Sequence, residues 1–338
     1  MAILVTGGAG YIGSHMTHAL AERGEEVIVL DNLSTGFEWA VAPDATLLIG
    51  DVGDAELLKM IFATHDIEAV VHFAGSIVVP ESVENPLKYY ANNTVNSRTL
   101  IEQAVQAGVP HFIFSSTAAV YGIPERSPAD EETPTAPINP YGRSKLMTEW
   151  MLQDVAAAHP LTYVALRYFN VAGADPKGRT GQSTPEATHL IKVACQTVLG
   201  QREKMFIFGD DYDTPDGTCI RDYIHVTDLI AAHLDALEYL RKGGESAVFN
   251  CGYGHGYSVR EVIDMVKKVS GVDFPVEVAP RRPGDPPELV AAAEKIRTTL
   301  DWQPQFDDLE EIVASALAWE RHLQRRNLTS ARSVEEMA

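Results

Sequence analysis

The chain has 338 residues, of which 45% are apolar and 22% are charged, a composition typical of a globular protein with about two domains or one large core and an appendage. This composition excludes a disordered or collagen-like chain. Lys and Arg number 27 against 47 Asp and Glu, which gives a formal net charge of −20. Because this charge repels phosphate backbones and anionic lipids, neither nucleic acid nor a membrane surface is an expected partner.

The cysteines give no sign of a disulfide framework or a metal site. Cys195, Cys219 and Cys251 are an odd number and contain no C-x-x-C pair, so we expect no metal. The first residues have no basic leader, and no apolar run approaches ~18 residues. We therefore expect a cytoplasmic protein that is neither exported nor membrane-spanning.

Short β-branched segments alternate with helical patterns through the first half of the chain. This alternation predicts βαβ crossovers and an α/β fold with a doubly wound parallel sheet, whose ligands bind beyond the carboxyl ends of the strands. The predicted strands are Ile3–Thr6, Val27–Asp31, Thr46–Gly50, Ala69–Phe73, His111–Ser115 and Thr162–Arg167. Functional residues are therefore expected directly after each strand.

The pattern becomes irregular after about residue 172, which predicts a second, smaller α/β lobe. Val226–Leu240 and Ala247–Asn250 again resemble a helix and a strand of the main sheet, so the two lobes are expected to interleave. We predict a main lobe of residues 1–172 and about 223–251, a second lobe of 173–222 and about 252–326, and a polar, frayed tail of 327–338. The last helix is expected over about Asp307–Arg326.

A glycine motif follows the first predicted strand and begins a helix. Gly7, Gly10 and Gly13 have the spacing G-x-x-G-x-x-G, which lets the backbone approach a pyrophosphate at the helix N-terminus. Alone, such a motif equally suits a tight turn. Asp31 ends the second strand 18 residues after Gly13, where a carboxylate binds an adenosine ribose and repels a 2′-phosphate. The pattern predicts a Rossmann site for NAD rather than NADP.

Two further segments fit the edges of a dinucleotide groove. Phe73–Gly75 follows the fourth predicted strand, and Asp51 follows the third. Asp51 is equally suited to cap the next helix. Together with the glycine motif, these segments predict a complete dinucleotide site.

A second reactive motif lies at a predicted helix start. Asn139 is a suitable N-cap and Pro140 suits the first turn, so Tyr141 and Lys145 are i and i+4 on one helix face. A nearby ammonium and an oxidised nicotinamide both favour the phenolate of Tyr141; lowering its pKa from ~10 to ~7 requires about 4 kcal/mol. The Y-x-x-x-K spacing occurs on many helices by chance, but here Ser115–Thr117 ends a strand beside the same predicted crevice.

These features together resemble the extended short-chain dehydrogenase/reductase superfamily over nearly the full chain. More narrowly, three segments resemble the UDP-glucose 4-epimerase (UDP-galactose 4-epimerase) family: Asn139–Lys145, Arg167–Asn170 and Phe208–Val226, the last being the most specific. The resemblance implies tightly bound NAD and the interconversion of UDP-galactose and UDP-glucose through a 4-keto sugar. It also implies a homodimer formed by the helices Leu87–Ala107 and Tyr141–Ala157.

The resemblance also implies roles for individual residues. Tyr141 would be the catalytic base and acid, Lys145 would hold the nicotinamide ribose and lower the pKa of Tyr141, and Thr117 would bind the sugar 4-hydroxyl. The implied NAD-binding residues are Gly7, Gly10, Tyr11, Ile12, Gly13, Asp31, Asn32, Ser34, Asp51, Val52, Phe73, Ala74, Gly75, Asn92, Lys145 and Phe169. The implied UDP-sugar residues are Thr117, Tyr141, Asn170, Leu190, Phe206, Ile207, Phe208, Arg221, Arg282 and Asp285.

Some positions depart from the family pattern or allow another reading. Ile77 stands where many members carry a lysine that contacts the cofactor ribose, so cofactor retention is expected to be weaker. His189 replaces an Asn that often contacts substrate, and Leu289 stands where the family sets the width of the sugar pocket. Arg282 suits a diphosphate, but Arg281 and Arg282 also suit surface ion pairs in an acid-rich chain.

Several other functions stay open on the sequence. A nucleotide-sugar 4,6-dehydratase is disfavoured, because Ala118 and Ala119 stand where such enzymes place an Asp-Glu pair after the Thr. A 4-epimerase of an N-acetylhexosamine, uronate or pentose stays open. A net NAD-dependent dehydrogenase would need cofactor exchange, and a non-catalytic NAD(H)-binding regulator would not need Thr117, Tyr141 and Lys145, all of which are present.

Overall fold

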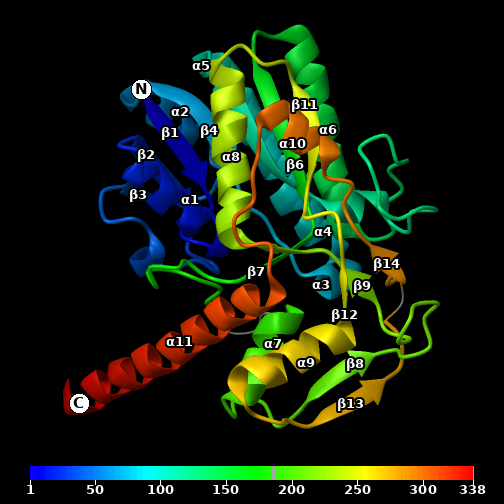
Figure 1. Cartoon of the computed structure of the whole chain (residues 1–338). Coiled ribbons are helices and arrows are strands. Elements are labelled where there is room, and N and C mark those ends of the chain that lie inside the picture. Colours follow the sequence, from blue (N-terminus) through cyan, green and yellow to red (C-terminus); the bar gives the residue numbers. More distant parts are fainter. Residues whose placement is uncertain (185–187, 283, 338) are drawn as a thin grey trace.

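The structure, a computed structural model, describes residues 1–184, 188–282 and 284–337. Its centre is a seven-stranded parallel sheet in the order β11-β6-β5-β4-β1-β2-β3 (Figure 1). This sheet confirms the predicted fold class. Its strands are β1 (Ala2–Thr6), β2 (Glu26–Asp31), β3 (Thr46–Ile49), β4 (Ile67–His72), β5 (His111–Thr117), β6 (Thr162–Tyr168) and β11 (Ala247–Cys251).

Helices cover both faces of this sheet because its strands are apolar on both sides. Side chains of Ile3 and Val5 point to one core, which also contains residues of α1 and α8, whereas Leu4 points to a second core with residues of α2, α5 and α6. The covering helices are α1 (Tyr11–Glu22), α2 (Ala55–Thr64), α5 (Asn96–Ala107), α6 (Pro140–Ala158) and α8 (Val226–Arg241). This arrangement leaves the carboxyl ends of the strands free for a site.

The order in which strands are added to the sheet reverses between β1 and β4. The chain adds β2 and β3 on one side of β1, and then adds β4, β5, β6 and β11 on the other side. The connections that leave β1 and β4 therefore diverge, and doubly wound sheets bind their ligands in the crevice that this creates. As the sequence predicts, α8 and β11 return to the main sheet, where β11 pairs with β6.

The segment after β4 differs from the single helix predicted over Leu87–Ala107. It contains α3 (Val79–Glu84), α4 (Pro86–Tyr89), a π-helical turn (Tyr90–Val95) and α5. Pro86 begins α4, and the π turn widens the helix by one residue per turn. Such widened turns are frequent at functional sites, and this one carries Asn92, a predicted cofactor residue.

The second lobe packs three helices against short strands (Figure 1). Its core is continuous with the α1 and α8 side of the main sheet, because Val262, Ile263 and Ile312 belong to the same cluster of buried side chains. Its elements are α7 (Leu190–Val198), β8 (Met205–Phe208), β9 (Ile220–Arg221), β12 (Tyr257–Ser258), α9 (Val259–Ser270), β13 (Val276–Ala279), β14 (Glu288–Leu289) and α11 (Leu309–Met337). Outside the seven-stranded sheet, β7 (Asn170–Ala172) pairs with β10 (Tyr223–His225), and α10 (Glu294–Leu300) contacts β11 and α8. Short 3₁₀ turns cover Glu38–Ala40 and Ala118–Tyr121.

The last helix, α11, is longer than the sequence predicts. It continues to Met337 and extends away from the rest of the molecule (Figure 1), whereas the prediction ends it near Arg326 and treats 327–338 as a frayed tail. The backbone continues as a helix because this stretch contains neither Gly nor Pro. Within the described residues, no helix combines the length and apolarity needed to cross a membrane.

Candidate active site

The glycine loop packs directly beneath the crevice between β1 and β4. Gly7 has φ +70°, and a Cβ at this position would lie 2.6 Å from the backbone N of Ala74. A Cβ at Gly13 would lie 2.1 Å from the carbonyl O of Gly7. Gly10 is the N-cap of α1 and supplies no side-chain cap, so the first backbone N–H groups of the helix are available to an anion.

Asp31 organises the turn on which an adenosine ribose is expected. Its Oδ2 accepts a hydrogen bond from Ala9 N at 2.9 Å, and its Oδ1 accepts one from Leu33 N at 2.8 Å. Asn32 in turn accepts a hydrogen bond from Ser34 N at 3.0 Å. The carboxylate thus fixes the glycine loop and the following turn to each other.

Asp51 is not the cap of the next helix, since Asp54 takes that position. Its Oδ2 accepts a hydrogen bond from Asn32 Nδ2 at 2.9 Å, and its Oδ1 accepts one from Asn96 Nδ2 at 2.9 Å. Asp51 therefore joins the turn after β2 to the start of α5, with the buried Val52 directly behind it. The sequence allows Asp51 to cap a helix or to contact the dinucleotide, and the structure excludes the helix cap.

The segment Phe73–Gly75 lies between the glycine loop and helix α6. A Cβ at Gly75 would lie 3.5 Å from Lys145 Nζ. Asn92 donates a hydrogen bond to Ser76 Oγ at 2.9 Å, and Asn93 accepts one from Ser76 N at 2.7 Å. The π turn therefore fixes the segment after β4. The hydrogen bond between Asn93 and Ser76 has no signal in the sequence, because it joins residues 17 apart.

Tyr141 and Lys145 lie side by side on the first turns of α6, as their spacing predicts. Asn139 caps the helix by accepting a hydrogen bond from Gly142 N at 2.8 Å. Tyr141 is 9% exposed and Lys145 is 3% exposed. Lys145 Nζ donates to the carbonyl O of Ser115 at 3.0 Å, so α6 is attached to the end of β5.

Burial dominates the ionisation of this pair. It raises the pKa of Tyr141, and a hydrogen bond with Thr117 lowers that pKa in part. Burial also lowers the pKa of the Lys145 ammonium to about 8. In the protein alone, Thr117 rather than Lys145 is therefore the group that favours the phenolate, because the ammonium is directed to a backbone carbonyl.

Six of the residues predicted for the UDP-sugar form two groups on the second lobe: Arg221 with Asp285, and Arg282 with the strand Phe206–Phe208. In one group, Arg221 pairs with Leu289 between β9 and β14, and its Nη2 lies 3.9 Å from Asp285 Oδ1. In the other, the Arg282 guanidinium stacks on Phe208, with its Cζ 3.8 Å from the ring centroid. Within that strand Ile207 is buried and Phe206 is 40% exposed.

The contacts of Arg281 and Arg282 separate the two roles that the sequence allows for these arginines, a surface ion pair and binding of the diphosphate. Leu289 and Phe169 pack against the buried cluster that contains Ala118 and Leu146, so the Arg221 group adjoins the segment that follows Thr117. Arg281 Nε donates to Asp211 Oδ1 at 2.6 Å, so the surface ion pair considered for this arginine is present. Arg282 instead lies against Phe208, in the strand predicted to bind the UDP-sugar.

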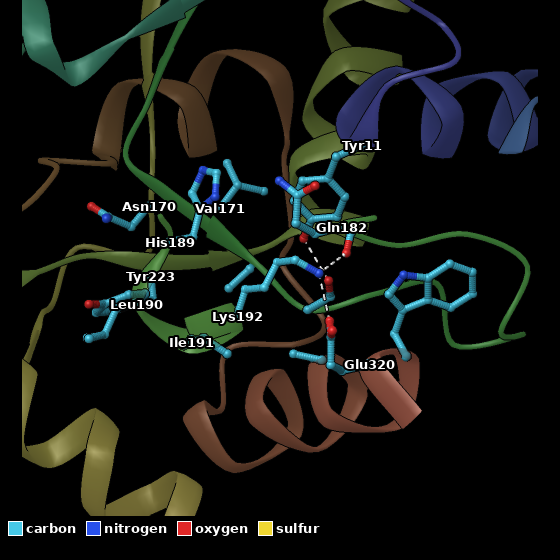
Figure 2. Close-up of a pocket in the computed structure, with 14 residues that line it drawn as sticks. Tyr11, Asn170, Val171, Gln182, His189, Leu190, Ile191, Lys192, Tyr223 and Glu320 are labelled. Atoms are coloured by element: carbon cyan, nitrogen blue, oxygen red, sulfur yellow. Dashed lines mark hydrogen bonds and ion pairs between the residues drawn. The ribbon is translucent and has the colours of Figure 1, made fainter. Parts of the chain in front are cut away.

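A narrow pocket joins the predicted cofactor and substrate residues. Tyr11, Asn170 and Leu190 line it together with Lys192, and Figure 2 shows dashed lines from the Lys192 ammonium to Gln182 and Glu320. Lys192 Nζ lies 2.7 Å from Glu320 Oε2 and donates to Gln182 O at 2.8 Å. The sequence gives no signal for this buried ion pair, because its partners are 128 residues apart.

The comparisons with known proteins decide the family. The model of the NAD dependent epimerase/dehydratase family matches residues 3–252. The chain belongs to this family. Its cofactor is accordingly NAD, and the glycine loop fits a dinucleotide, since a side chain at Gly7 or Gly13 would collide with backbone atoms and block the helix N-terminus. No cluster of three or more possible metal ligands occurs in the described ranges.

Relatives within this NAD dependent epimerase/dehydratase family span nearly the whole chain. A UDP-glucose 4-epimerase of Azospirillum brasilense is 61% identical over 323 residues, which cover 96% of this chain and 93% of the relative. The crystal structure of UDP-glucose 4-epimerase from Brucella ovis in complex with NAD is 44% identical, has a TM-score of 0.91 and covers 94% of this chain and 97% of that one. The structure of the UDP-Glc/GlcNAc 4-epimerase of Campylobacter jejuni is 55% identical, has a TM-score of 0.84 and covers 95% and 99%.

Proposed function

We propose that this chain is an NAD-dependent UDP-glucose 4-epimerase that interconverts UDP-galactose and UDP-glucose. The observation that carries the proposal is the buried Tyr141 on the same helix face as Lys145, whose ammonium binds the carbonyl of Ser115 two residues before Thr117. The names of the relatives support the same substrates. Ala118 and Ala119 carry no acid or base, which favours epimerisation over dehydration.

The proposed chemistry assigns a separate task to each residue. NAD, held by the glycine loop, would supply the acceptor for the C4 hydride of the sugar and then the donor of that hydride to the opposite face of the resulting 4-keto sugar, so there is no net oxidation. Tyr141 Oη accepts the proton of the 4-hydroxyl and later gives it back. Thr117 Oγ hydrogen-bonds the same oxygen. With NAD bound, Lys145 would hold the nicotinamide ribose and lower the pKa of Tyr141. Burial of this group excludes water, which prevents loss of the oxidised sugar.

The same proposal covers the other residues of the site and the division of the chain. Residues 1–172 and about 223–251 form the NAD-binding lobe, and 173–222 with about 252–326 form the UDP-sugar lobe. The cofactor and UDP-sugar residue sets predicted from the sequence are retained as proposed contacts. The guanidinium groups of Arg221 and Arg282 supply two cations for the diphosphate of the UDP-sugar, which the net negative charge of the protein would otherwise repel.

Proton NMR of the purified protein with UDP-galactose and no added NAD tests the function. We expect the anomeric signal of UDP-glucose to appear, because the reaction consumes no cofactor. If it appears only after NAD is added, the hydrophobic Ile77, which is 50% exposed beside the cofactor segment, accounts for weak retention. Silence under both conditions contradicts the proposal.

The width of the sugar pocket decides whether N-acetylated substrates are accepted. Leu289 packs against the buried cluster that contains Ala118, the residue after Thr117, and the similarity to a UDP-Glc/GlcNAc 4-epimerase supports acceptance. We expect Leu289→Tyr to lower kcat/KM for UDP-N-acetylgalactosamine at least ~10-fold more than for UDP-galactose, because the larger ring fills the space of the acetamido group. Leu289→Met, of similar volume, is the control, and equal losses for both sugars would contradict this prediction.

A homodimer in the cytoplasm completes the proposal. Leu87, 77% exposed, and Trp150, 52% exposed, lie on α4 and α6, and these two helices contact each other. Two large apolar side chains on neighbouring helices are typical of an interface rather than of a free surface. The described cysteines are all free and buried, which suits a reducing compartment.

A further inference from the structure

A buried ion pair between Glu149 and Arg167 lies one helical turn after Lys145 on α6. Glu149 and Arg167 are 4% and 6% exposed. Arg167 Nη2 donates to Glu149 Oε2 at 2.6 Å and Arg167 Nε donates to Oε1 at 3.0 Å, which is a two-pronged contact between α6 and β6. The two residues are 18 positions apart in the sequence, and neither is predicted to bind the cofactor or the substrate.

Glu149 continues the helix face that carries the reactive groups. Tyr141, Lys145 and Glu149 are spaced four residues apart, so they form one row along α6. Lys145 binds the carbonyl of Ser115, and Glu149 accepts a hydrogen bond from the Ser116 hydroxyl. Two consecutive residues of β5 are thus attached to α6 immediately before Thr117.

Arg167 extends the contact to the segment after Thr117. Its Nη1 donates to the Tyr121 hydroxyl at 3.0 Å, and its Cζ lies 5.0 Å from the centroid of the Tyr121 ring. Tyr121 in turn donates to Asn250 Oδ1 at 2.7 Å. Thr117 therefore lies between two points, Ser116 and Tyr121, that the Glu149–Arg167 pair holds.

We propose that Glu149 and Arg167 are positioning residues that set Tyr141 of α6 against Thr117 of β5. This inference rests on the proposed function, in which Tyr141 exchanges the proton of the sugar hydroxyl. Replacing a buried ion pair by apolar side chains of similar volume is often neutral or stabilising, so stability alone gives no reason for charges at this place. Their directional hydrogen bonds fix the register of helix and strand, which apolar contacts do not.

The test replaces the whole pair, so that no single charge is left buried. In purified holoenzyme, Glu149→Leu/Arg167→Met is expected to lower kcat about 10- to 100-fold while KM for UDP-galactose changes less than about threefold, because misplacement of a reacting group by ~1 Å costs up to ~100-fold. The acid limb of the kcat–pH profile should move to higher pH, since the Thr117 hydrogen bond that lowers the pKa of Tyr141 is weakened. A double variant with wild-type kcat and profile would overturn the proposal.

Two further variants separate positioning from stability. Arg241 forms ion pairs at 2.7 and 2.8 Å with Glu25, directly before β2, and with Glu68 near the start of β4, at the end of the sheet opposite Tyr141. Arg241→Met should lower the melting temperature but leave kcat and the pH profile unchanged. Should the double variant fail to fold, Ser116→Ala removes one hydrogen bond of the pair, and it should lower kcat several-fold with the same pH shift. Wild-type values in a folded Ser116→Ala would count against the proposal.

A titration without substrate distinguishes this inference from the proposed function. The absorbance of the phenolate near 295 nm, taken as the difference between each protein and its Tyr141→Phe counterpart, follows Tyr141 alone. Inactivity of the wild type towards UDP-galactose would refute the proposed function. The titration would still decide the positioning role: a shift of Tyr141 to higher pH in the double variant supports it, and an unchanged curve overturns it.

Discussion

Tyr141 and Lys145 are buried in positions where each is less easily charged than in water. Burial raises the pKa of Tyr141 and lowers that of Lys145 to about 8, while the hydrogen bond with Thr117 favours the phenolate. A reactive Tyr in such surroundings depends on a few directed contacts rather than on solvent. Each of these contacts can be removed by one substitution.

We expect Tyr141→Phe to lower kcat at least ~100-fold, because general acid–base catalysis contributes about 10²–10⁴ and Phe cannot exchange a proton. Only the hydroxyl is lost, so the melting temperature and the NAD content should stay close to wild type. Proton NMR of UDP-galactose conversion measures kcat, thermal unfolding gives the melting temperature, and the absorbance of released cofactor gives the NAD content. Activity within tenfold of wild type would mean that another group carries the proton.

The residues of the site differ in how far the sequence could predict them. The spacing of Tyr141 and Lys145 on one helix turn is local, and it predicted their placement correctly. The sequence could not predict that Arg167 pairs with Glu149, or that Lys192 pairs with Glu320, because those contacts depend on how distant elements pack. The one available signal was that Glu149 lies four residues after Lys145 on the same face.

At the scale of elements, the glycine loop and α1 act as one unit. We expect Gly13→Ala to abolish copurification of NAD, since its Cβ would lie 2.1 Å from Gly7 O and force the loop away from the helix N-terminus. Gly24→Ala is the control: φ is +76° there but a Cβ would meet nothing within 4 Å. This variant should lose about 1 kcal/mol of stability and keep its NAD. Equal NAD content in both variants would contradict the prediction.

Regular elements were easier to predict than their interruptions. The strands of the first half agree with the sequence to within two residues at each end, because β-branched segments and βαβ spacing are local signals. The π turn at Tyr90–Val95 has no such signal, since it depends on the hydrogen bonds that Asn92 and Asn93 make with Ser76. The continuation of α11 to Met337 also lacks apolar periodicity, so the polar composition misled the prediction.

At the scale of the molecule, the proposed homodimer depends on the exposed apolar side chains of α4 and α6. We expect Leu87→Asp/Trp150→Glu to convert a dimer into a monomer, because a buried interface disfavours unpaired carboxylates. Sedimentation velocity measures the change. Met60→Glu, at another exposed apolar residue, is the control and should remain a dimer. A wild type that sediments as a monomer would contradict the proposal.

Stability of the whole molecule should fall in mild acid because several histidines are buried in neutral form. Burial lowers the pKa of His15 and His233 to about 4 and that of His72 and His225 to about 3, against 6.5 for the free side chain. Below pH 6.5 the unfolded chain therefore binds protons that the folded chain does not. The free energy of unfolding then decreases as the pH falls from 6.5 towards 4, by about 1.4 kcal/mol per pH unit for each proton taken up.

His233 is the clearest case for a substitution, since its Nε2 is buried without a hydrogen-bond partner in the described structure and its Nδ1 contacts only the carbonyl of Leu229 on its own helix. We expect His233→Leu to reduce the proton uptake on unfolding between pH 4 and 6.5 by about one, and thus to flatten the dependence of stability on pH. Urea unfolding at half-unit pH steps measures this slope, with the exposed His159→Leu as the control. An unchanged slope in His233→Leu would mean that this imidazole is already charged in the folded protein, and its burial would then have to be compensated by a group that faces Nε2.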